Sequence, residues 1–198
     1  MDALETARRN LHSFITTFNM LTPQEVDTIV DGTNIQAFPK GTVLLKEGQV
    51  SDKCYFVLKG LIREYYLKDG EEKTTAFFTE NEPVNSFTSN NSKSPSRSYL
   101  ECTEDCILTV GTDDIIEAMC KKVPRLENLM RVEVEKNAGK FQDEYAAFIM
   151  SSPEERYVSL LEKRPGLMNR VPQHQIASYL GVKPESLSRI RKRLLTAK

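Results

Sequence analysis

Hydrophobic residues follow two different spacings along this 198-residue chain. From residue 3 to residue 31 they recur every three or four positions, which is typical of amphipathic helices. One stripe of this segment contains Leu11, Phe14, Ile15 and Phe18. The sequence Thr22-Pro23-Gln24-Glu25 is typical of a helix start, because proline suits the first turn and an acid at the third position completes a capping box. We therefore predict a mainly helical N-terminal segment.

Residues 34 to 110 change to short β-rich runs separated by turn residues. The predicted strands cover residues 35–38, 42–45, 54–58, 61–67, 74–78, 97–102 and 107–110. Asp69-Gly70 is a strong hairpin-turn signal between two of these runs. So many short strands in so few residues predict a small barrel or sandwich. The polar stretch 85–98 interrupts the pattern as a loop, which is either functional or surface decoration.

The helical spacing returns at Asp113, breaks at Pro124 and then continues to about residue 150. The apolar seam of this long segment contains Leu126, Met130, Val134, Ala138, Phe141, Tyr145 and Phe148. A helix of about 25 residues spans nearly 40 Å, which is more than a small barrel covers. A second copy of the same helix is therefore the economical partner, and the alternative is a seam that packs only on its own domain. Ser151 to Glu155 then starts a new helix and marks a domain boundary.

Two short helical patterns flank Gly181 near the end of the chain. The first opens at Pro172 and carries Ile176, Ala177 and Leu180, and the second opens at Pro184 and carries Leu187, Ile190 and Leu194. Glycine tolerates the left-handed conformation that a sharp turn requires. This arrangement predicts a helix-turn-helix.

A separate arc of the second helix carries its polar residues: Glu185, Ser186, Arg189, Lys192 and Arg193. A guanidinium can bond guanine and a carboxylate can accept from cytosine, so Arg189 and Glu185 are candidates for base contacts in a major groove. Lys192 and Arg193 are candidates for phosphate contacts. Lys183 stands at the N-cap position, where free amides of the helix start could receive a phosphate. The alternative is a solvated helix whose cations only favour the negative end of its dipole.

The charge distribution favours the DNA-binding interpretation. The formal net charge is only −1, yet residues 151–198 hold ten Lys and Arg against four Asp and Glu, while residues 1–150 hold 17 against 24. An acidic body joined to a basic module is the asymmetry expected when one module approaches a polyanion.

Several other classes of protein lack support in the sequence. There is neither an apolar run of membrane-spanning length nor a signal-peptide core, so we expect a cytoplasmic protein with no membrane partner. The four cysteines, Cys54, Cys102, Cys106 and Cys120, do not complete a zinc site, and we expect reduced, buried thiols. No catalytic triad, metal cluster or phosphate-binding loop stands out, so we predict no enzyme, no catalytic residue, no metal and no cofactor.

The order of β-roll, long helical seam and basic helix-turn-helix resembles the Crp/Fnr family of bacterial transcription regulators. Residues 39–48 and 54–60, with glycine corners at Gly41, Gly48 and Gly60, are similar to the strand pattern of the family's cyclic-nucleotide-binding roll. Residues 175–189 are similar to its recognition module. Glu185 and Arg189 match two of the family's three base-contacting residues, but Pro184 falls at the place of the first arginine. The resemblance therefore implies a different or shorter DNA half-site.

The effector pocket departs further from the family pattern. Ser96-Arg97-Ser98 resembles the Arg-Ser that holds the cyclic phosphate in the family, which makes Arg97 and Ser98 candidate ligand-binding residues. The Gly-Glu that binds the ribose is missing from residues 83–87, where Phe87 stands near the place of the carboxylate. We therefore expect weak cAMP binding or none, with another anionic ligand as one option and an exposed, ion-paired Arg97 as the other. The cysteine and histidine positions support neither the iron–sulfur nor the haem branch of the family.

We thus predict an α+β protein with an N-terminal β-roll, a long dimerisation helix and a C-terminal, mainly α winged helix-turn-helix domain. The predicted boundaries are 1–123 for the effector domain, 124–150 for the dimerisation helix and 151–198 for the DNA-binding domain. The predicted function is that of a homodimeric, sequence-specific DNA-binding transcription regulator with a degenerate nucleotide pocket. Double-stranded DNA and a second copy are its expected partners, RNA polymerase is a further candidate, and the effector is unknown. The alternative function is a sensor of a cyclic nucleotide or another anionic small molecule.

Overall fold

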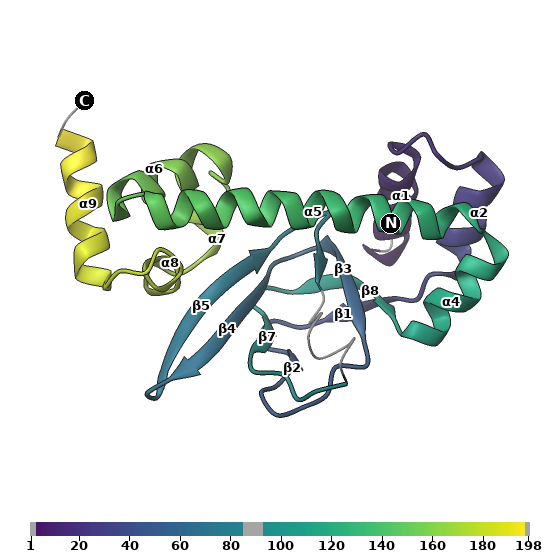
Figure 1. Cartoon of the computed structure of the whole chain (residues 1–198), viewed down its shortest axis with the longest axis horizontal. Coiled ribbons are helices and arrows are strands. Elements are labelled where there is room, and N and C mark those ends of the chain that lie inside the picture. The colour runs from purple at the N-terminus through teal and green to yellow at the C-terminus, as the bar shows by residue number, and fades with distance from the viewer. Residues whose placement is uncertain (1–2, 85–92, 197–198) are drawn as a thin grey trace. The chain divides into compact units, whose positions relative to one another are not determined.

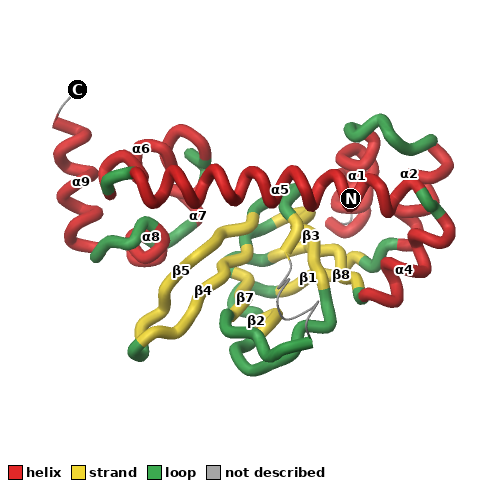
Figure 2. The backbone as a smooth tube through the Cα atoms, in the orientation of Figure 1, coloured by secondary structure: helices red, strands yellow, loops and turns green. Residues whose placement is uncertain are grey.

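The computed structural model of the chain describes residues 3–84 and 93–196 (Figure 1). The chain forms two units, which are treated separately. The first consists of Met1–Glu64 and Phe77–Lys136, and the second of Tyr65–Ala76 and Asn137–Lys198. Figure 2 shows that all strands lie between two groups of helices along the chain.

The first unit begins with two helices, α1 (Ala3–Thr16) and α2 (Pro23–Gly32). The predicted capping box is present, because the Glu25 amide donates to Thr22 Oγ1 at 3.3 Å and the Thr22 amide donates to the Glu25 carboxylate at 2.7 Å. The apolar faces of both helices share one core with parts of the roll. The core residues are Ala7, Leu11, Ile15, Val26, Ile29, Val30, Leu58, Ile107 and Val123.

The roll consists of two four-stranded sheets, with strand orders β1-β8-β3-β6 and β2-β7-β4-β5. Its strands are β1 (Ile35–Phe38), β2 (Val43–Leu45), β3 (Cys54–Lys59), β4 (Ile62–Lys68), β5 (Glu71–Phe78), β6 (Pro83–Val84), β7 (Tyr99–Cys102) and β8 (Cys106–Gly111). All seven predicted strands are present, and only the two-residue β6 was not predicted. Both sheets contribute to one apolar core, which includes Leu45, Val57, Ile62, Leu100 and Leu108. The predicted β-roll is confirmed.

The β4–β5 hairpin has the turn that its sequence predicts. Asp69 and Gly70 have φ values of 54° and 77°. Positive φ at both central residues defines the type I′ turn, whose twist matches that of the flanking strands. The hairpin is shared between the two units, because Tyr65–Ala76 belongs to the second unit while both strand ends belong to the first.

Two helices follow the roll, α4 (Asp113–Lys122) and α5 (Arg125–Met150), with the predicted break at Pro124 between them. Helix α5 has 26 residues, so it is about 39 Å long at the standard rise. Only Leu129 of α5 is buried. None of the described helices combines the length and apolar character needed to cross a membrane.

The second unit contains α6 (Pro153–Lys163), α7 (Leu167–Arg170), α8 (Gln173–Tyr179) and α9 (Pro184–Thr196). Ser152 and Glu155 form a second capping box at the start of α6. The small core of these helices contains Tyr157, Leu160, Leu167, Val171, Ile176, Ala177, Leu180, Leu187 and Ile190. Pro172 is the N-cap of α8 rather than its first residue, and α7 was not predicted. The described residues 151–196 contain helices and no strand, so the wing of the predicted module is not among them.

We expect Gly60→Ala to destabilise the roll strongly. Gly60 has φ +103°, and an added Cβ would lie 2.6 Å from Cys106 Sγ and 2.8 Å from Cys106 Cα. Gly41→Ala is the matched control, because Gly41 has φ +82° with nothing within 4 Å of the added Cβ. Both variants carry backbone strain of about 1–2 kcal/mol, but only Gly60→Ala adds an overpacking cost of about 1–3 kcal/mol. Urea unfolding measures both losses, and equal losses would contradict the steric argument.

Candidate nucleic-acid interface

The turn between α8 and α9 is set by backbone hydrogen bonds at a glycine. Gly181 has φ +71°, its amide donates to the Ser178 carbonyl at 3.0 Å, and the Val182 amide donates to the Ala177 carbonyl at 2.9 Å. This pair of bonds is the Schellman motif, which ends a helix at a left-handed residue. The predicted glycine turn is therefore confirmed, and it determines the direction in which the chain enters α9.

Arg156 of α6 holds this turn from the inside of the second unit. Its Nη1 donates to the Leu180 carbonyl at 3.0 Å, and its Nε donates to the Ser151 carbonyl at 3.1 Å. Its guanidinium carbon also lies 3.9 Å from the ring centroid of Phe148, near the end of α5. A planar guanidinium can bond and stack simultaneously in this way, whereas a lysine ammonium cannot. One side chain thus connects the end of α5, the start of α6 and the α8–α9 turn.

Helix α9 buries its apolar stripe as predicted. Leu187 and Ile190 are buried, and Leu194 is half-buried. The Lys183 carbonyl accepts from the amides of Ser186 at 3.0 Å and Leu187 at 3.1 Å, which places Lys183 at the N-cap. The lysine side chain has no acceptor for the first amides of α9, so the N-cap residue leaves them available for an anion.

The predicted DNA-contacting residues all lie away from this apolar stripe. Five of them are exposed, namely Lys183, Glu185, Arg189, Lys192 and Arg193, and Ser186 is half-buried. Arg193 differs from the others because its Nη2 lies 2.6 Å from the Glu154 carboxylate in the first turn of α6. Exposed pairs of this kind are weak in water, so a phosphate could compete with Glu154 for this guanidinium.

The two candidate ligand-binding residues of the roll, Arg97 and Ser98, lie in different environments. Arg97 is exposed, whereas Ser98 is only 3% exposed and its hydroxyl donates to Glu64 Oε1 at 2.8 Å. The Ser96 hydroxyl donates to the Ser98 carbonyl at 3.0 Å. Phe87 and its neighbours at 85–92 lie outside the described residues. Ser98 is therefore bonded inside the roll, and a ligand at Arg97 stays a prediction.

An ion pair with a buried arginine joins β4 to β7. Arg63 is 3% exposed, and its Nη2 lies 3.2 Å from Glu101 Oε2 on β7. Removing one partner of such a pair would leave an uncompensated buried charge, which is strongly destabilising. The strand that carries Glu64 is thus held by charged and polar bonds on consecutive residues.

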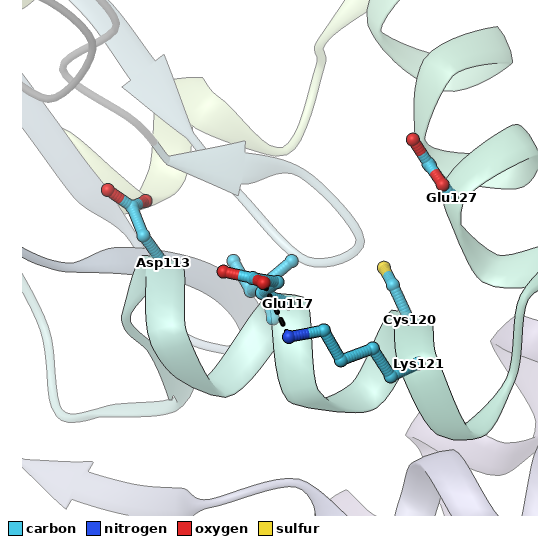
Figure 3. Close-up of a pocket in the computed structure, with 6 residues that line it drawn as sticks. Asp113, Glu117, Cys120, Lys121 and Glu127 are labelled. Atoms are coloured by element: carbon cyan, nitrogen blue, oxygen red, sulfur yellow. Dashed lines mark ion pairs between the residues drawn. The ribbon is translucent and has the colours of Figure 1, made fainter.

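A shallow hollow of about 490 Å³ lies between α4 and the first turn of α5 (Figure 3). Three of its six lining residues are acidic, namely Asp113 and Glu117 of α4 and Glu127 of α5, and one, Lys121, is basic. Lys121 Nζ lies 2.6 Å from Glu117 Oε1. An acidic wall does not suit an anionic effector. Burial and the charge of Glu127 raise the pKa of the Cys120 thiol, so this thiol is less reactive than usual.

The other titratable and metal-binding chemistry is sparse in the part of the chain that the structure describes. All four cysteines are free thiols, with Cys102 and Cys106 buried and Cys54 and Cys120 half-buried. No group of three His, Cys, Asp or Glu side chains within 3–84 and 93–196 is placed to hold a metal ion.

Arg156 was not predicted from the sequence to have a role at the α8–α9 turn. It occurs in a helix with several charged residues, and nothing in the spacing distinguishes it from a solvated arginine. Only the partners at Leu180 and Phe148 show that it supports the α8–α9 turn.

The sequence was compared with protein-family models and with curated proteins. Residues 35–122 match the family model of the cyclic nucleotide-binding domain. A comparison with curated proteins found no significant match to the sequence.

Solved structures share the fold over most of the chain. The c-di-GMP-responsive global regulator CLP of Xanthomonas campestris has a TM-score of 0.68 at 16% identity and covers 89% of this chain and 93% of its own. FixK2 of Bradyrhizobium japonicum has a TM-score of 0.66 at 17% identity and covers 83% of this chain and 85% of its own. The catabolite activator protein of Thermus thermophilus has a TM-score of 0.54 at 18% identity and covers 89% and 85%. These neighbours are Crp/Fnr-family regulators, which confirms at the level of the fold the resemblance and the α+β class predicted from sequence.

We expect Arg156→Gln to destabilise the second unit by about 1.5–3 kcal/mol, the range for hydrogen bonds made by charged groups. Arg131→Gln is the control, because Arg131 is exposed on α5 and bonds two side chains of its own helix, Glu135 at 2.7 Å and Asn128 at 2.8 Å. The control should lose less than about 0.5 kcal/mol. The stability of both variants is measured by thermal unfolding and by hydrogen exchange at α8 and α9. If Arg156→Gln has the stability of the wild type, Arg156 does not support the α8–α9 turn.

Proposed function

We propose that this chain, whose residues 35–122 match the cyclic nucleotide-binding domain, is a homodimeric, sequence-specific DNA-binding transcription regulator of the Crp/Fnr type. The observation that carries the proposal is the Gly181 turn followed by α9, which buries Leu187 and Ile190 and exposes Glu185 and Arg189. A helix with a buried apolar stripe and a narrow basic face fits the major groove.

The proposed roles on α9 follow from the position of each side chain. Arg189 contacts guanine and Glu185 contacts cytosine, because both are exposed and lie one turn apart. Ser186 contributes a hydroxyl at the edge of the same face. Lys183 and Lys192 neutralise phosphates, and Arg193 does so after leaving Glu154.

The proposed dimer interface is the apolar stripe of α5. On a helical wheel Met130, Val134, Phe141, Tyr145 and Phe148 fall within about 60° of one another. Phe141 is 70% exposed and Tyr145 is 60% exposed, and their rings stack at 6.4 Å between centroids. Such a run of exposed aromatic and aliphatic side chains favours association with a second copy. Two-fold symmetry would then place the two α9 helices in major grooves about 34 Å apart.

A second candidate function is supported by the match of residues 35–122 to the cyclic nucleotide-binding domain. In that case the roll binds a cyclic nucleotide or another anion, with Arg97 and Ser98 as the proposed contacts. Ser98 would have to exchange its bond to Glu64 for a bond to the ligand. Calorimetric titration with cAMP, cGMP and c-di-GMP decides this function, since micromolar binding of any one would support it and no heat with all three would oppose it.

Arg189→Ala should lose sequence discrimination at one base pair per half-site, at about 1–3 kcal/mol. Lys192→Ala should weaken all duplexes alike and reduce the salt slope of binding by about one. A selection from a random duplex pool defines the site, and fluorescence anisotropy then compares that site with a scrambled duplex. Equal losses on both duplexes for Arg189→Ala would rule out the base contact.

The dimer interface can be tested with two identical substitutions on α5. Val134→Glu places a charge on the apolar stripe and should dissociate the dimer, because an unpaired charge in an apolar interface is strongly unfavourable. Val132→Glu is the matched control, since Val132 projects about 160° away from Val134 on the helical wheel. Analytical ultracentrifugation should show a monomer for the first variant and a dimer for the second. A dimer for both would place the interface elsewhere.

A further inference from the structure

The tip of the β4–β5 hairpin, defined as residues 69–74, contacts α8 within the second unit through Glu72 and Thr74 at the start of β5. The Ser178 hydroxyl donates to the Glu72 carbonyl at 3.1 Å, and the Thr74 amide donates to the same hydroxyl at 2.9 Å. Ser178 lies more than 100 positions later in the sequence than either partner. A single hydroxyl therefore joins the hairpin backbone to the first helix of the helix-turn-helix, and it does so on both its donor and its acceptor side.

The hairpin tip brings negative charge to this module. Residues 65–76 hold three acids, Asp69, Glu71 and Glu72, against two lysines, Lys68 and Lys73, which is a net charge of −1. The hydrogen bond and charge of Lys73 lower the pKa of Glu71, and the charge of Lys183 acts in the same direction. Glu71 is thus ionised at neutral pH and lies within electrostatic range of the residue that precedes α9. A DNA phosphate at Lys183 would be repelled by this carboxylate.

Some buried polar atoms near the contact between the hairpin and α8 lack hydrogen-bond partners. Thr74 Oγ1 and Gln175 Oε1 are two of the buried side-chain atoms of the described residues that have no hydrogen-bond partner. Thr74 is the hairpin residue whose amide bonds Ser178, and Gln175 precedes Ser178 by three positions, on the same face of α8. Buried polar atoms without partners oppose the docked arrangement, so the contact can be released more easily than a fully bonded one.

We propose that the hairpin tip is an autoinhibitory contact, held by Ser178 on α8, that must be released before the helix-turn-helix engages DNA. This inference rests on the proposed function, because it concerns access to the same α8–α9 module. The first helix of a helix-turn-helix lies across the DNA backbone, so an acidic segment on α8 competes with phosphate for that surface.

The hairpin also has a direct covalent connection to the roll. Glu64, which accepts the Ser98 hydroxyl bond, is the residue immediately before the hairpin segment Tyr65–Ala76. An anion that took Ser98 away from Glu64 would change a bond on the strand that leads into the tip. The same strand therefore links the candidate ligand residue with the contact at Ser178.

The test compares two variants that change the net charge equally. Glu71→Gln removes the carboxylate at the tip, and Asp31→Asn removes an exposed carboxylate of α2 as the matched control. Binding to a 30-base-pair duplex of mixed sequence is measured by anisotropy at one fixed salt concentration. Glu71→Gln should bind about threefold to tenfold more tightly than the control. Equal affinities, or weaker binding by Glu71→Gln, would overturn the proposal.

Hydrogen exchange at the Thr74 amide gives a readout that does not depend on affinity. Adding the duplex to the wild-type chain should accelerate exchange at Thr74, and Ser178→Ala should accelerate it without DNA. Slower or unchanged exchange at Thr74 in the DNA complex would show that the tip stays docked, which overturns autoinhibition while leaving DNA binding intact. Absence of duplex binding by the wild type and by every variant would instead refute the proposed function, and the inference with it.

Discussion

The position of α9 depends on the arginine that supports the turn before it. Arg156 bonds the Leu180 carbonyl and stacks on Phe148, so the end of α5, the start of α6 and the α8–α9 turn share one side chain. Leu180 is the C-cap of a seven-residue helix, where backbone acceptors lack partners within the helix. A charged donor at this point stabilises both the end of α8 and the left-handed residue that follows. This bond supports the Gly181 turn, which determines the direction in which the chain enters α9.

The roll combines an apolar core with hydrogen bonds and an ion pair between polar side chains. Its two sheets bury an apolar core, and two polar pairs join side chains at its edge, Ser98–Glu64 and Arg63–Glu101. Such bonds are strong in a low-dielectric interior, so a ligand that enters must replace them with bonds at least as favourable. This requirement makes the interior selective, and it couples any occupant to strand β4, which carries both Arg63 and Glu64.

The proposed helix-turn-helix and the hairpin that contacts it differ in charge. The C-terminal segment is basic, whereas the hairpin turn contributes acids, and the Ser178 bonds bring them together in one unit. An internal acid that faces a basic module screens it from non-specific polyanions as well as from a specific site. Under the proposed function, binding of DNA and docking of the hairpin are linked equilibria, and each weakens the other by the same free energy.

The sequence by itself determined the features that depend on residues close together in the chain. The capping boxes at Thr22 and Ser152, the Asp69-Gly70 turn, the break at Pro124 and the Gly181 turn all follow from interactions over a few positions, and the apolar spacing adds the strands and the buried stripe of α9. The tertiary structure alone decided which polar groups meet. The pairs Ser178–Glu72, Arg156–Leu180, Arg193–Glu154 and Ser98–Glu64 join residues that lie 24 to 106 positions apart. A polar side chain forms a hydrogen bond with any suitable group that packing places within about 3 Å. Its residue type therefore does not predict which distant residue that partner will be.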